Sequence, residues 1–342
     1  MSIRTPLGAA VLGVFCTPMV ASPVFAQSVA PSSLPAAATQ SSAAGNGTTR
    51  ESALPAVSVT GAGGEDFAPD GLSSVGGKIP TALRDVPQTV TTVNRALLNS
   101  QAANSFEQAL RNVPGITIGA AEGGSIGNNI NLRGFTARTD IYLDGFRDRG
   151  QYYRDTFDLE QIEVLYGPSS MLFGRGSTGG IINQESKKAN LHASNEVSAM
   201  IGTHDQYRST LDMNHPISDT AAVRLNVFGQ SLHSTRDVES QKDYGFAPEL
   251  RFGIGTPTEI TLSALIQHNR DMPDYGVQAV NGHPVAVGKG TFYGLTDDRT
   301  IQDVQQFTGR IDHTFSPNLK FSNQTRYAHY ATDARETAPG NV

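Results

Sequence analysis

Between residues 195 and 330 the sequence repeats one pattern, in which polar and apolar side chains alternate over segments of about ten residues. From Glu259 to Gln267, for example, the even-numbered residues are apolar and most odd-numbered residues are polar. A period of two places successive side chains on opposite faces of a β-strand. We count seven such segments, at residues 195–203, 206–214, 220–232, 246–253, 258–268, 304–314 and 318–330. The pattern therefore predicts about seven strands.

The connections between these segments differ in length in a regular way. Short turns are expected at residues 216–219, 255–257 and 316–317, and longer polar loops at 233–245 and 270–303. Strands of about ten residues with alternating faces, joined by short turns at one end and long loops at the other, are typical of a transmembrane β-barrel. A soluble β-sandwich with one polar face has the same alternation, so the strands alone leave both architectures open.

The N-terminus favours the membrane architecture. Residues 1–26 begin with a positive charge at Arg4, continue with an apolar stretch over 7–20, and place small residues at the cleavage positions up to Ala26. This is the pattern of a secretory signal peptide, which predicts cleavage before Gln27 and export from the cytoplasm. Export and the unequal loops together favour the barrel over the β-sandwich.

Residues 27–77 are expected to form a flexible segment. Up to Ser52 they are mostly Ala, Ser, Pro, Gln and Thr, which cannot bury enough apolar surface to fold. A short β-prone stretch follows, made of Leu54, Pro55, Ala56, Val57, Ser58, Val59 and Thr60. With no core of its own to join, such a stretch can add itself as a strand to the sheet of another chain. A chance pair of valines in a linker is the alternative.

Residues 78–188 have the mixed pattern of an α+β domain. A strand is predicted at 83–93 and an amphipathic helix at 96–112, which Val113-Pro114-Gly115 ends. Further short strands are predicted at 116–118, 130–132, 141–143, 162–165 and 180–183. Residues 189–342 then carry the alternating segments. The predicted fold is an α+β domain followed by the first strands, about seven, of an antiparallel transmembrane β-barrel.

Seven strands cannot close a bacterial up-and-down barrel, which has an even number of strands. An open edge in lipid leaves backbone groups unpaired, at a cost of roughly several kcal/mol for each group. We therefore expect residues 189–342 to be the N-terminal part of a barrel that is incomplete in this chain and that a longer protein completes. A non-functional truncated fragment is the alternative.

Six blocks within residues 83–188 carry a specific resemblance. They are Asp85–Val90, Ala109–Ile116, Asn131–Phe135, Tyr142–Gly145, Leu159–Pro168 and the glycine-rich Leu172–Asn183. In this order and spacing they resemble the plug domain of the TonB-dependent outer-membrane siderophore receptors. Leu54–Gly61 is similar to the TonB box of that family, and Phe292–Leu295 is similar to the catecholate-type receptors. Gln161 and Tyr166 depart from the family, because many members have arginine there.

The resemblance implies a fold and a function. The whole protein would be a barrel of about 22 strands in the outer membrane, with residues 78–188 as a plug in its lumen and the N-terminus in the periplasm. It would bind a ferric siderophore and transport it into the periplasm, driven by the TonB complex through the box at 54–60. A receptor for vitamin B12, a sugar or nickel, and an adhesin or a phage and colicin receptor, are the alternatives.

The segment from Phe146 to Arg154 carries the most distinctive chemistry, because it places three arginines and two tyrosines between predicted strands. Guanidinium groups offer charge and planar donors to an anionic or aromatic chelate, and tyrosine offers an apolar face with a polar tip. In ferrichrome-type members of the family the arginine of the Arg-Gly-Phe block faces the ligand, which adds Arg133. The candidate siderophore-binding residues are Arg133, Arg138, Arg147, Arg149, Tyr152, Tyr153 and Arg154. An ordinary solvated loop is the alternative.

A second group of residues is predicted to have a structural role in the plug. Glycines tolerate the positive φ of tight turns. Glu160, Glu163 and Arg175 are expected to pair between the plug and the barrel wall, because buried charges need partners. The full set is Gly134, Gly145, Glu160, Glu163, Gly167, Pro168, Gly174, Arg175, Gly179 and Gly180.

The composition argues against several other classes of function. Lys and Arg total 26 and Asp and Glu total 32, and the resulting net charge of −6 argues against a nucleic-acid-binding protein. The only cysteine, Cys16, lies in the leader, so no disulfide, thiolate nucleophile or Cys-ligated metal is expected. No enzyme motif is present, so we expect no enzymatic activity, no cofactor and no metal site, since iron would arrive inside its chelate. The expected partners are TonB, a ferric siderophore and outer-membrane lipid.

Overall fold

The computed structural model describes residues 72–75, 81–119, 126–174, 178–277, 279–280 and 283–338. The chain divides into two compact units, residues 1–60 and 61–342, and every described residue belongs to the second. The predicted signal peptide, the predicted TonB box at 54–60 and Arg175 lie outside the described residues. In the described part, no helix is both long enough and apolar enough to cross a lipid bilayer.

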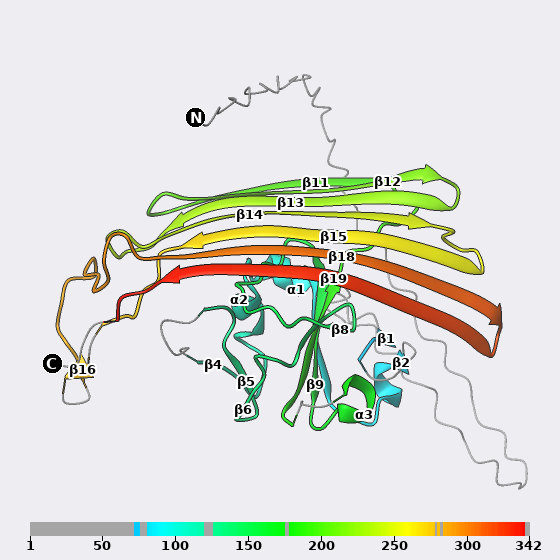
Figure 1. Ribbon diagram of the computed structural model, residues 1–342, viewed down its shortest axis with the longest axis horizontal. Helices are drawn as coiled ribbons and strands as arrows, with labels where there is room; N and C mark the ends of the chain where they lie inside the picture. The colour runs from blue at the N-terminus through cyan, green and yellow to red at the C-terminus, as the bar shows by residue number, and fades with distance from the viewer. Residues whose placement is uncertain are drawn as a thin grey trace, which may run out of the picture. The chain divides into compact units, whose positions relative to one another are not determined.

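The α+β domain is built around a five-stranded sheet, coloured cyan to green in Figure 1. In spatial order its strands are β3 (Val90–Asn94), β9 (Leu159–Tyr166), β10 (Gly180–Ser186), β7 (Ile141–Leu143) and β8 (Phe146–Arg147). A small second sheet contains β4 (Ile116–Ile118), β5 (Ile130–Leu132) and β6 (Phe135–Thr136), and β1 (Leu72–Ser73) pairs with β2 (Thr81–Ala82). The short strands predicted from the sequence are thus confirmed, two of them with wider bounds.

The predicted helix at 96–112 is in fact two helices. The α-helices of the described domain are α1 (Arg95–Ser100), α2 (Phe106–Leu110) and α3 (Ser170–Phe173). Ala102 has a φ of 47° between α1 and α2, which interrupts the helical backbone. Ser105 and Gln108 then form a capping box that starts α2. The helix therefore breaks because of local capping interactions, which the spacing of apolar residues does not indicate.

The strand predicted at 83–93 is also shorter than expected. Leu83–Asp85 turn through a 3-10 helix, and extended pairing starts only at Val90, opposite Leu165 of β9. The side chains that fill the core come from both sheets and from α1 and α2. The largest fully buried apolar side chains are those of Leu98, Phe106, Leu110, Ile130, Leu132, Ile141, Leu159, Ile162, Leu165, Ile181 and Ile182. Burial of each contributes roughly 1.5–3 kcal/mol, which fixes the pairing of the strands.

Residues 194–335 form a seven-stranded antiparallel sheet whose strands are neighbours in chain order (Figure 1). They are β11 (Ser194–Gly202), β12 (Gln206–Ser218), β13 (Ala221–His233), β14 (Ser240–Phe252), β15 (Thr258–Asp271), β18 (Arg299–Ser316) and β19 (Leu319–Arg335). The seven predicted strands are confirmed. Most are longer than predicted, because the hydrogen-bonded ladder continues through polar residues beyond one end of the alternating segment, and beyond both ends in β18.

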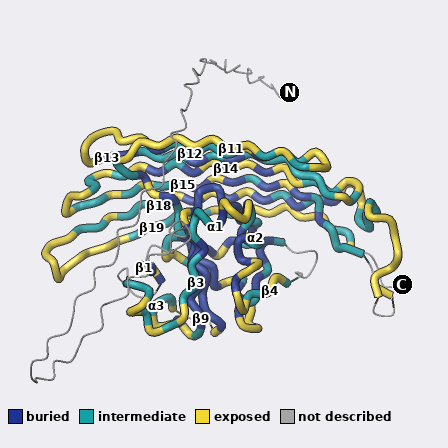
Figure 2. Tube along the Cα trace, turned by 180° about the vertical axis from the view of Figure 1, so that it is seen from behind, coloured by how far each residue is buried: buried dark blue, intermediate teal, exposed yellow. Residues whose placement is uncertain are grey.

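The two faces of this sheet have different neighbours, as the alternating burial in Figure 2 shows. On β15, Ile260, Leu262 and Ile266 are exposed on what we call the outer face. Leu265 and Gln267 are buried on the inner face, against which the α+β domain packs. The predicted alternation therefore separates a surface that suits lipid from a surface that suits a packed domain.

The two ends of the sheet also differ. At the short-turn end, strands are joined through residues 219–220, 253–257 and 317–318. At the long-loop end the connections are 203–205, 234–239 and 272–298, the last of which includes the hairpin of β16 (Ala279–Val280) and β17 (His283–Pro284). The loop predicted at 233–245 is shorter than expected, because β14 begins at Ser240.

Candidate functional site

The segment from Phe146 to Asp158 joins the α+β domain to the inner face of the sheet, and we call it the anchor segment. At its start, the guanidinium carbon of Arg326 on β19 lies 5.3 Å from the centroid of the Phe146 ring. Near its end, Phe157 packs against Phe228 of β13, with ring centroids 4.6 Å apart. The anchor segment therefore crosses the inner face from β19 to β13.

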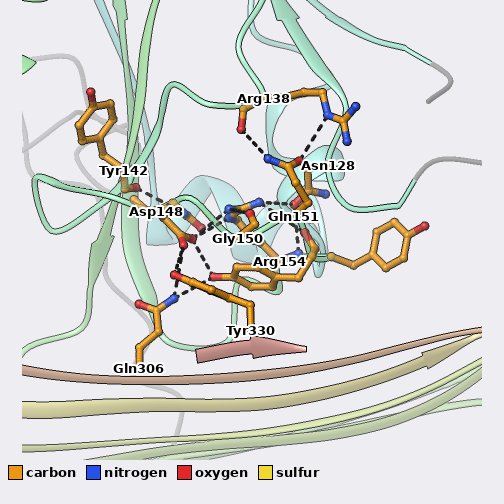
Figure 3. Close-up of polar contacts among 12 residues, drawn as sticks. Asn128, Arg138, Tyr142, Asp148, Gly150, Gln151, Arg154, Gln306 and Tyr330 are labelled. Carbon is orange, nitrogen blue, oxygen red and sulfur yellow. Dashed lines mark hydrogen bonds and ion pairs between the residues drawn. The ribbon is translucent and has the colours of Figure 1, made fainter. Parts of the chain in front are cut away.

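Asp148 is the centre of a buried network in this segment (Figure 3). Its Oδ2 accepts hydrogen bonds from Arg154 Nε (3.0 Å) and from the Tyr152 hydroxyl (2.8 Å). Its Oδ1 accepts from the hydroxyl of Tyr330 on β19 (2.7 Å) and from Gln306 Nε2 on β18 (3.5 Å). Burial, and then the charge of Asp148, raise the pKa of the Tyr152 hydroxyl well above its usual value, so it remains a donor. The carboxylate thus joins the α+β domain to two strands.

Arg154 is enclosed by this network and is only 2 % exposed. Its Nη2 donates to the carbonyl of Gly150 at 2.7 Å, and its guanidinium lies 4.3 Å from the centroid of the Tyr152 ring. A Cβ on Gly150 would lie 2.3 Å from the ring of Tyr330, so a glycine is required where β19 approaches the anchor segment. Arg154 and Tyr152 therefore support the anchor segment from within.

Three amide side chains on the inner face hold the backbone at Tyr153. Gln267 Nε2 and Asn269 Nδ2 of β15 donate to the Tyr153 carbonyl at 2.7 and 2.9 Å. Gln302 Oε1 of β18 accepts from the Tyr153 backbone nitrogen at 3.0 Å. The sequence analysis did not single out these amides. The alternation of β15 placed Gln267 on the polar face, but the backbone that it meets comes from a distant part of the chain.

Two ion pairs also connect the α+β domain to the sheet. Arg208 of β12 makes two hydrogen bonds of 2.7 Å to the carboxylate of Asp155, and both residues are buried. Lys187 Nζ lies 2.7 Å from Asp212 Oδ2, a carboxylate that Arg224 also contacts at 2.8 Å. Pairing of this kind offsets the desolvation cost of buried charges.

The expected pairing of Glu163 with the sheet is not what the described residues show. Glu163 lies on β9, between β3 and β10, and its Oε2 accepts hydrogen bonds from the backbone nitrogen and hydroxyl of Ser74. Burial raises the pKa of Glu163. Glu160 on the same strand is exposed. The charged residues that do reach the sheet from the α+β domain are Asp155 in the anchor segment and Lys187, which the sequence did not indicate.

The predicted turn glycines have the backbone conformation that favours glycine. Positive φ values occur at Gly134 (82°), Gly145 (75°), Gly167 (90°), Gly174 (82°) and Gly180 (134°). Gly179 has a different constraint, because a Cβ there would lie 2.2 Å from the carbonyl oxygen of Leu132. Pro168 lies beside Gly167, and its carbonyl accepts a hydrogen bond from Gln88 Nε2 at 3.2 Å.

Arg133 and Arg138 lie outside the anchor segment. Arg133 is exposed, has a φ of 52°, and its guanidinium carbon lies 4.7 Å from the centroid of the Tyr166 ring. The Tyr166 ring thus lies against the guanidinium of Arg133. Arg138 is half-buried and donates from Nε to Gln151 Oε1 at 3.3 Å.

Two cavities open beside the anchor segment. A cavity of about 530 Å³ at the long-loop end is lined by Tyr153 and Arg154 together with β12 to β15. A cavity of about 790 Å³ towards the short-turn end is lined by Arg147 and Arg149, of which Arg147 pairs with Asp140 at 3.1 Å. Four of the candidate residues therefore line these cavities, two in each, whereas Arg133, Arg138 and Tyr152 line neither. Over the described ranges, no three His, Cys, Asp or Glu side chains gather as a metal site.

Comparison with known proteins identifies the domain that carries the anchor segment. Residues 82–181 match the family model of the TonB-dependent Receptor Plug Domain. The chain is 34 % identical over 302 residues to the probable TonB-dependent receptor BfrD of Bordetella pertussis. It is 34 % identical over 281 residues to the catecholate siderophore receptor Fiu of Escherichia coli K12. The chain belongs to the TonB-dependent receptors.

Solved structures of siderophore receptors agree with this family assignment. The siderophore receptor PiuA from Acinetobacter baumannii matches with a TM-score of 0.71 at 34 % identity, over 74 % of this chain and 38 % of PiuA. The closed form of Fiu matches with a TM-score of 0.72, over 78 % of this chain and 40 % of Fiu. BfrD is covered over 39 % of its length and Fiu of strain K12 over 37 %, so the chain spans about two-fifths of these relatives. The α+β domain is the plug, and the seven strands are strands of the receptor barrel.

We expect the change of Tyr330 to Phe to loosen the plug. It removes the 2.7 Å hydrogen bond to Asp148 Oδ1, whose other partner is Gln306 at 3.5 Å. An under-satisfied buried carboxylate costs roughly 1–3 kcal/mol. Hydrogen exchange of the anchor-segment amides in the full-length receptor should accelerate accordingly. Tyr327→Phe is the matched control, since Tyr327 is exposed on the outer face, and equal exchange in both variants would contradict the prediction.

Asp158 is expected to make the docked plug sensitive to pH. Burial, and then the carboxylate of Asp144, raise the pKa of Asp158 to about 7. In an unfolded chain the pKa of aspartate is about 3.9, so the native state holds this proton more tightly and loses stability as the pH rises from about 4 to 7. Asp158→Asn should flatten that loss and stabilise the receptor at neutral pH. An unchanged pH dependence of the thermal unfolding midpoint in the variant would contradict this.

Proposed function

We propose that this chain is part of a TonB-dependent outer-membrane receptor that binds a ferric siderophore and transports it into the periplasm. The observation that carries the proposal is its 34 % identity, over three-quarters of the chain, to a receptor named for catecholate siderophores. PiuA, named as a siderophore receptor, has a similar fold at the same identity. The named relatives are receptors and not enzymes, and the proposal includes no catalytic step and no resident cofactor.

The ligand would meet the plug at the long-loop end. The 530 Å³ cavity there combines the Tyr153 side chain with a wall of polar strand residues. The exposed Arg133 and the half-buried Arg138 have accessible guanidinium surface that suits an anionic or aromatic chelate. Arg147 and Arg149 line the other cavity, towards the short-turn end, and are not part of this proposed surface. Tyr152 and Arg154 are buried, and we assign them to the support of this surface.

Energy would enter through the N-terminal segment. The β-prone stretch at 54–60 suits addition as a strand to a sheet of TonB. The 17 residues from Gly61 to Gly77 span at most about 55–60 Å when extended, so a pull on the stretch can reach the plug from a distance. In this arrangement the N-terminus lies in the periplasm and the iron is cargo inside its chelate.

The proposal is tested by uptake of radioactive iron in a strain that lacks its own siderophore receptors and expresses the full-length receptor. Ferric catecholate should accumulate, and the accumulation should stop when TonB is deleted. Accumulation of cobalamin, a sugar or nickel in place of iron would favour a receptor for another nutrient. Binding without any TonB-dependent uptake would favour an adhesin or a phage and colicin receptor.

A further inference from the structure

We propose that the outer face of the sheet holds a lipid phosphate at its long-loop end, through Lys242 of β14 and Arg270 of β15. The recognised group is the phosphorylated headgroup of a lipid in the outer leaflet. This site lies on the opposite face of the sheet from the plug, and it does not take part in the proposed transport of iron.

The strand register brings these two cations together. The pairs on either side, Gln241 with Asp271 and Tyr244 with His268, place Lys242 across from Arg270. Both side chains are exposed, whereas their neighbours Asp243 and Asp271 are buried on the inner face. Like charges at directly opposite positions of an antiparallel pair are destabilising unless a countercharge is present.

The described protein does not supply that countercharge. Within the described ranges, neither the Lys242 side chain nor the Arg270 side chain takes part in an ion pair or a hydrogen bond, although the Arg270 backbone nitrogen donates to Asp243 Oδ1 at 3.1 Å. The nearest outward carboxylate on the neighbouring strand belongs to Asp303, and it is bound to His268 Nδ1 at 2.7 Å. The pair therefore presents two unneutralised cations to whatever lies beside the barrel.

The position of the pair along the strands identifies its environment. One step closer to the middle of the strands, Tyr244 and His268 stack with ring centroids 5.1 Å apart. Beyond them the outer face is apolar, with Phe246 beside Ile266 and then Leu250 beside Leu262, all exposed. Aromatic side chains favour the boundary between hydrocarbon and headgroups. Two residues along a strand span about 6.5–7 Å, so the cations lie at headgroup level.

A phosphate group fits this pair by its charge and by its oxygens. Lysine and arginine both donate charge-assisted hydrogen bonds to phosphate, and arginine can do so with two parallel donors. A lipid is a better occupant than a free phosphate ion, because its acyl chains would cover the apolar surface that continues from the site. The association would also relieve the repulsion between Lys242 and Arg270.

The test measures lipid binding by the full-length receptor in detergent, by native mass spectrometry, with lipid A as the probe. Lys242→Gln combined with Arg270→Gln should weaken binding of lipid A by roughly tenfold or more. Lys289→Gln combined with Arg335→Gln removes the same charge elsewhere and should leave binding unchanged. The exchange of the two residues, Lys242→Arg with Arg270→Lys, should retain binding and shows that the fold survives changes at both positions.

Three results would overturn the proposal. Lipid A that lacks its phosphates could bind as tightly as the phosphorylated form. The control variant could lose as much affinity as the Lys242 and Arg270 variant, which would indicate a general charge effect. Inorganic phosphate could displace lipid A completely at millimolar concentration, which would indicate an ion site instead of a lipid site. None of these results bears on iron uptake, so the two proposals fail independently.

Discussion

Replacement of Val57 by proline is expected to abolish energised uptake and to leave binding of the ligand at the cell surface intact. Val57 lies in the middle of the β-prone stretch at 54–60, outside the described residues. Proline has no backbone N–H and removes a ladder hydrogen bond from an added strand. Binding and uptake should separate because, in the proposed arrangement, the ligand meets the plug on the opposite side of the membrane from TonB. The measurement compares iron bound at low temperature with iron accumulated at growth temperature.

A proline just outside the stretch provides the control for this result. Ala62 lies in the glycine-rich segment that follows, where no strand pairing is expected. Ala62→Pro should therefore support normal uptake. Normal uptake by the Val57→Pro receptor would contradict the assignment of residues 54–60 as the TonB box. Loss of surface binding in that receptor would instead point to a defect in export or in folding.

Removal of the Asp155 carboxylate should cause a large loss of stability of the docked plug. Asp155→Ala leaves Arg208 buried without its bidentate partner. Loss of one member of a buried ion pair costs about 3–5 kcal/mol, because the other charge remains away from water. The opening free energy of the plug, measured by hydrogen exchange in the full-length receptor, should fall by that amount.

An exposed pair in the same molecule gives the comparison. Asp297 pairs with Arg335 at 2.6 Å, but both side chains are more than half exposed. Surface pairs of this kind contribute only about 0–1 kcal/mol, so Asp297→Ala should change little. A double change of Asp155 to Ala and Arg208 to Met should cost less than Asp155→Ala alone, because no buried charge then remains. Equal losses in all variants would show that the pair is not what holds the plug.

Much of the fold could be predicted because the relevant information is local. The alternation in residues such as Ile260 and Leu262 depends only on a period of two, and it located all seven strands of the described sheet. The turn at Gly167 could be predicted for the same reason, because a residue with φ of 90° favours glycine wherever it occurs. Capping at Ser105 is also local, but it acts through one hydrogen bond that an apolar pattern does not contain.

The candidate site could be predicted only in part, because it depends on contacts between distant residues. The sequence singled out Tyr152 and Arg154 as chemically distinctive. In the structure both are buried and donate hydrogen bonds to Asp148. Whether an arginine is exposed or enclosed depends on which strand lies beside it. Gln302 and Asn269 were missed for that reason, since an isolated polar residue on an alternating strand has no feature that indicates its partner.

The path of the anchor segment has a consequence for the order in which the receptor assembles. Its contacts join residues far apart in the chain, with sequence separations of 182 residues for Asp148 and Tyr330 and 53 for Asp155 and Arg208. Such contacts offset the entropy cost of closing long loops only when both partners are in place. The bonds from Asp148 to Tyr330 and Gln306 can therefore form only when β18 and β19 are in place, whereas its bonds to Tyr152 and Arg154 lie within the anchor segment. We therefore expect docking of the anchor segment onto the inner face to follow the pairing of these strands.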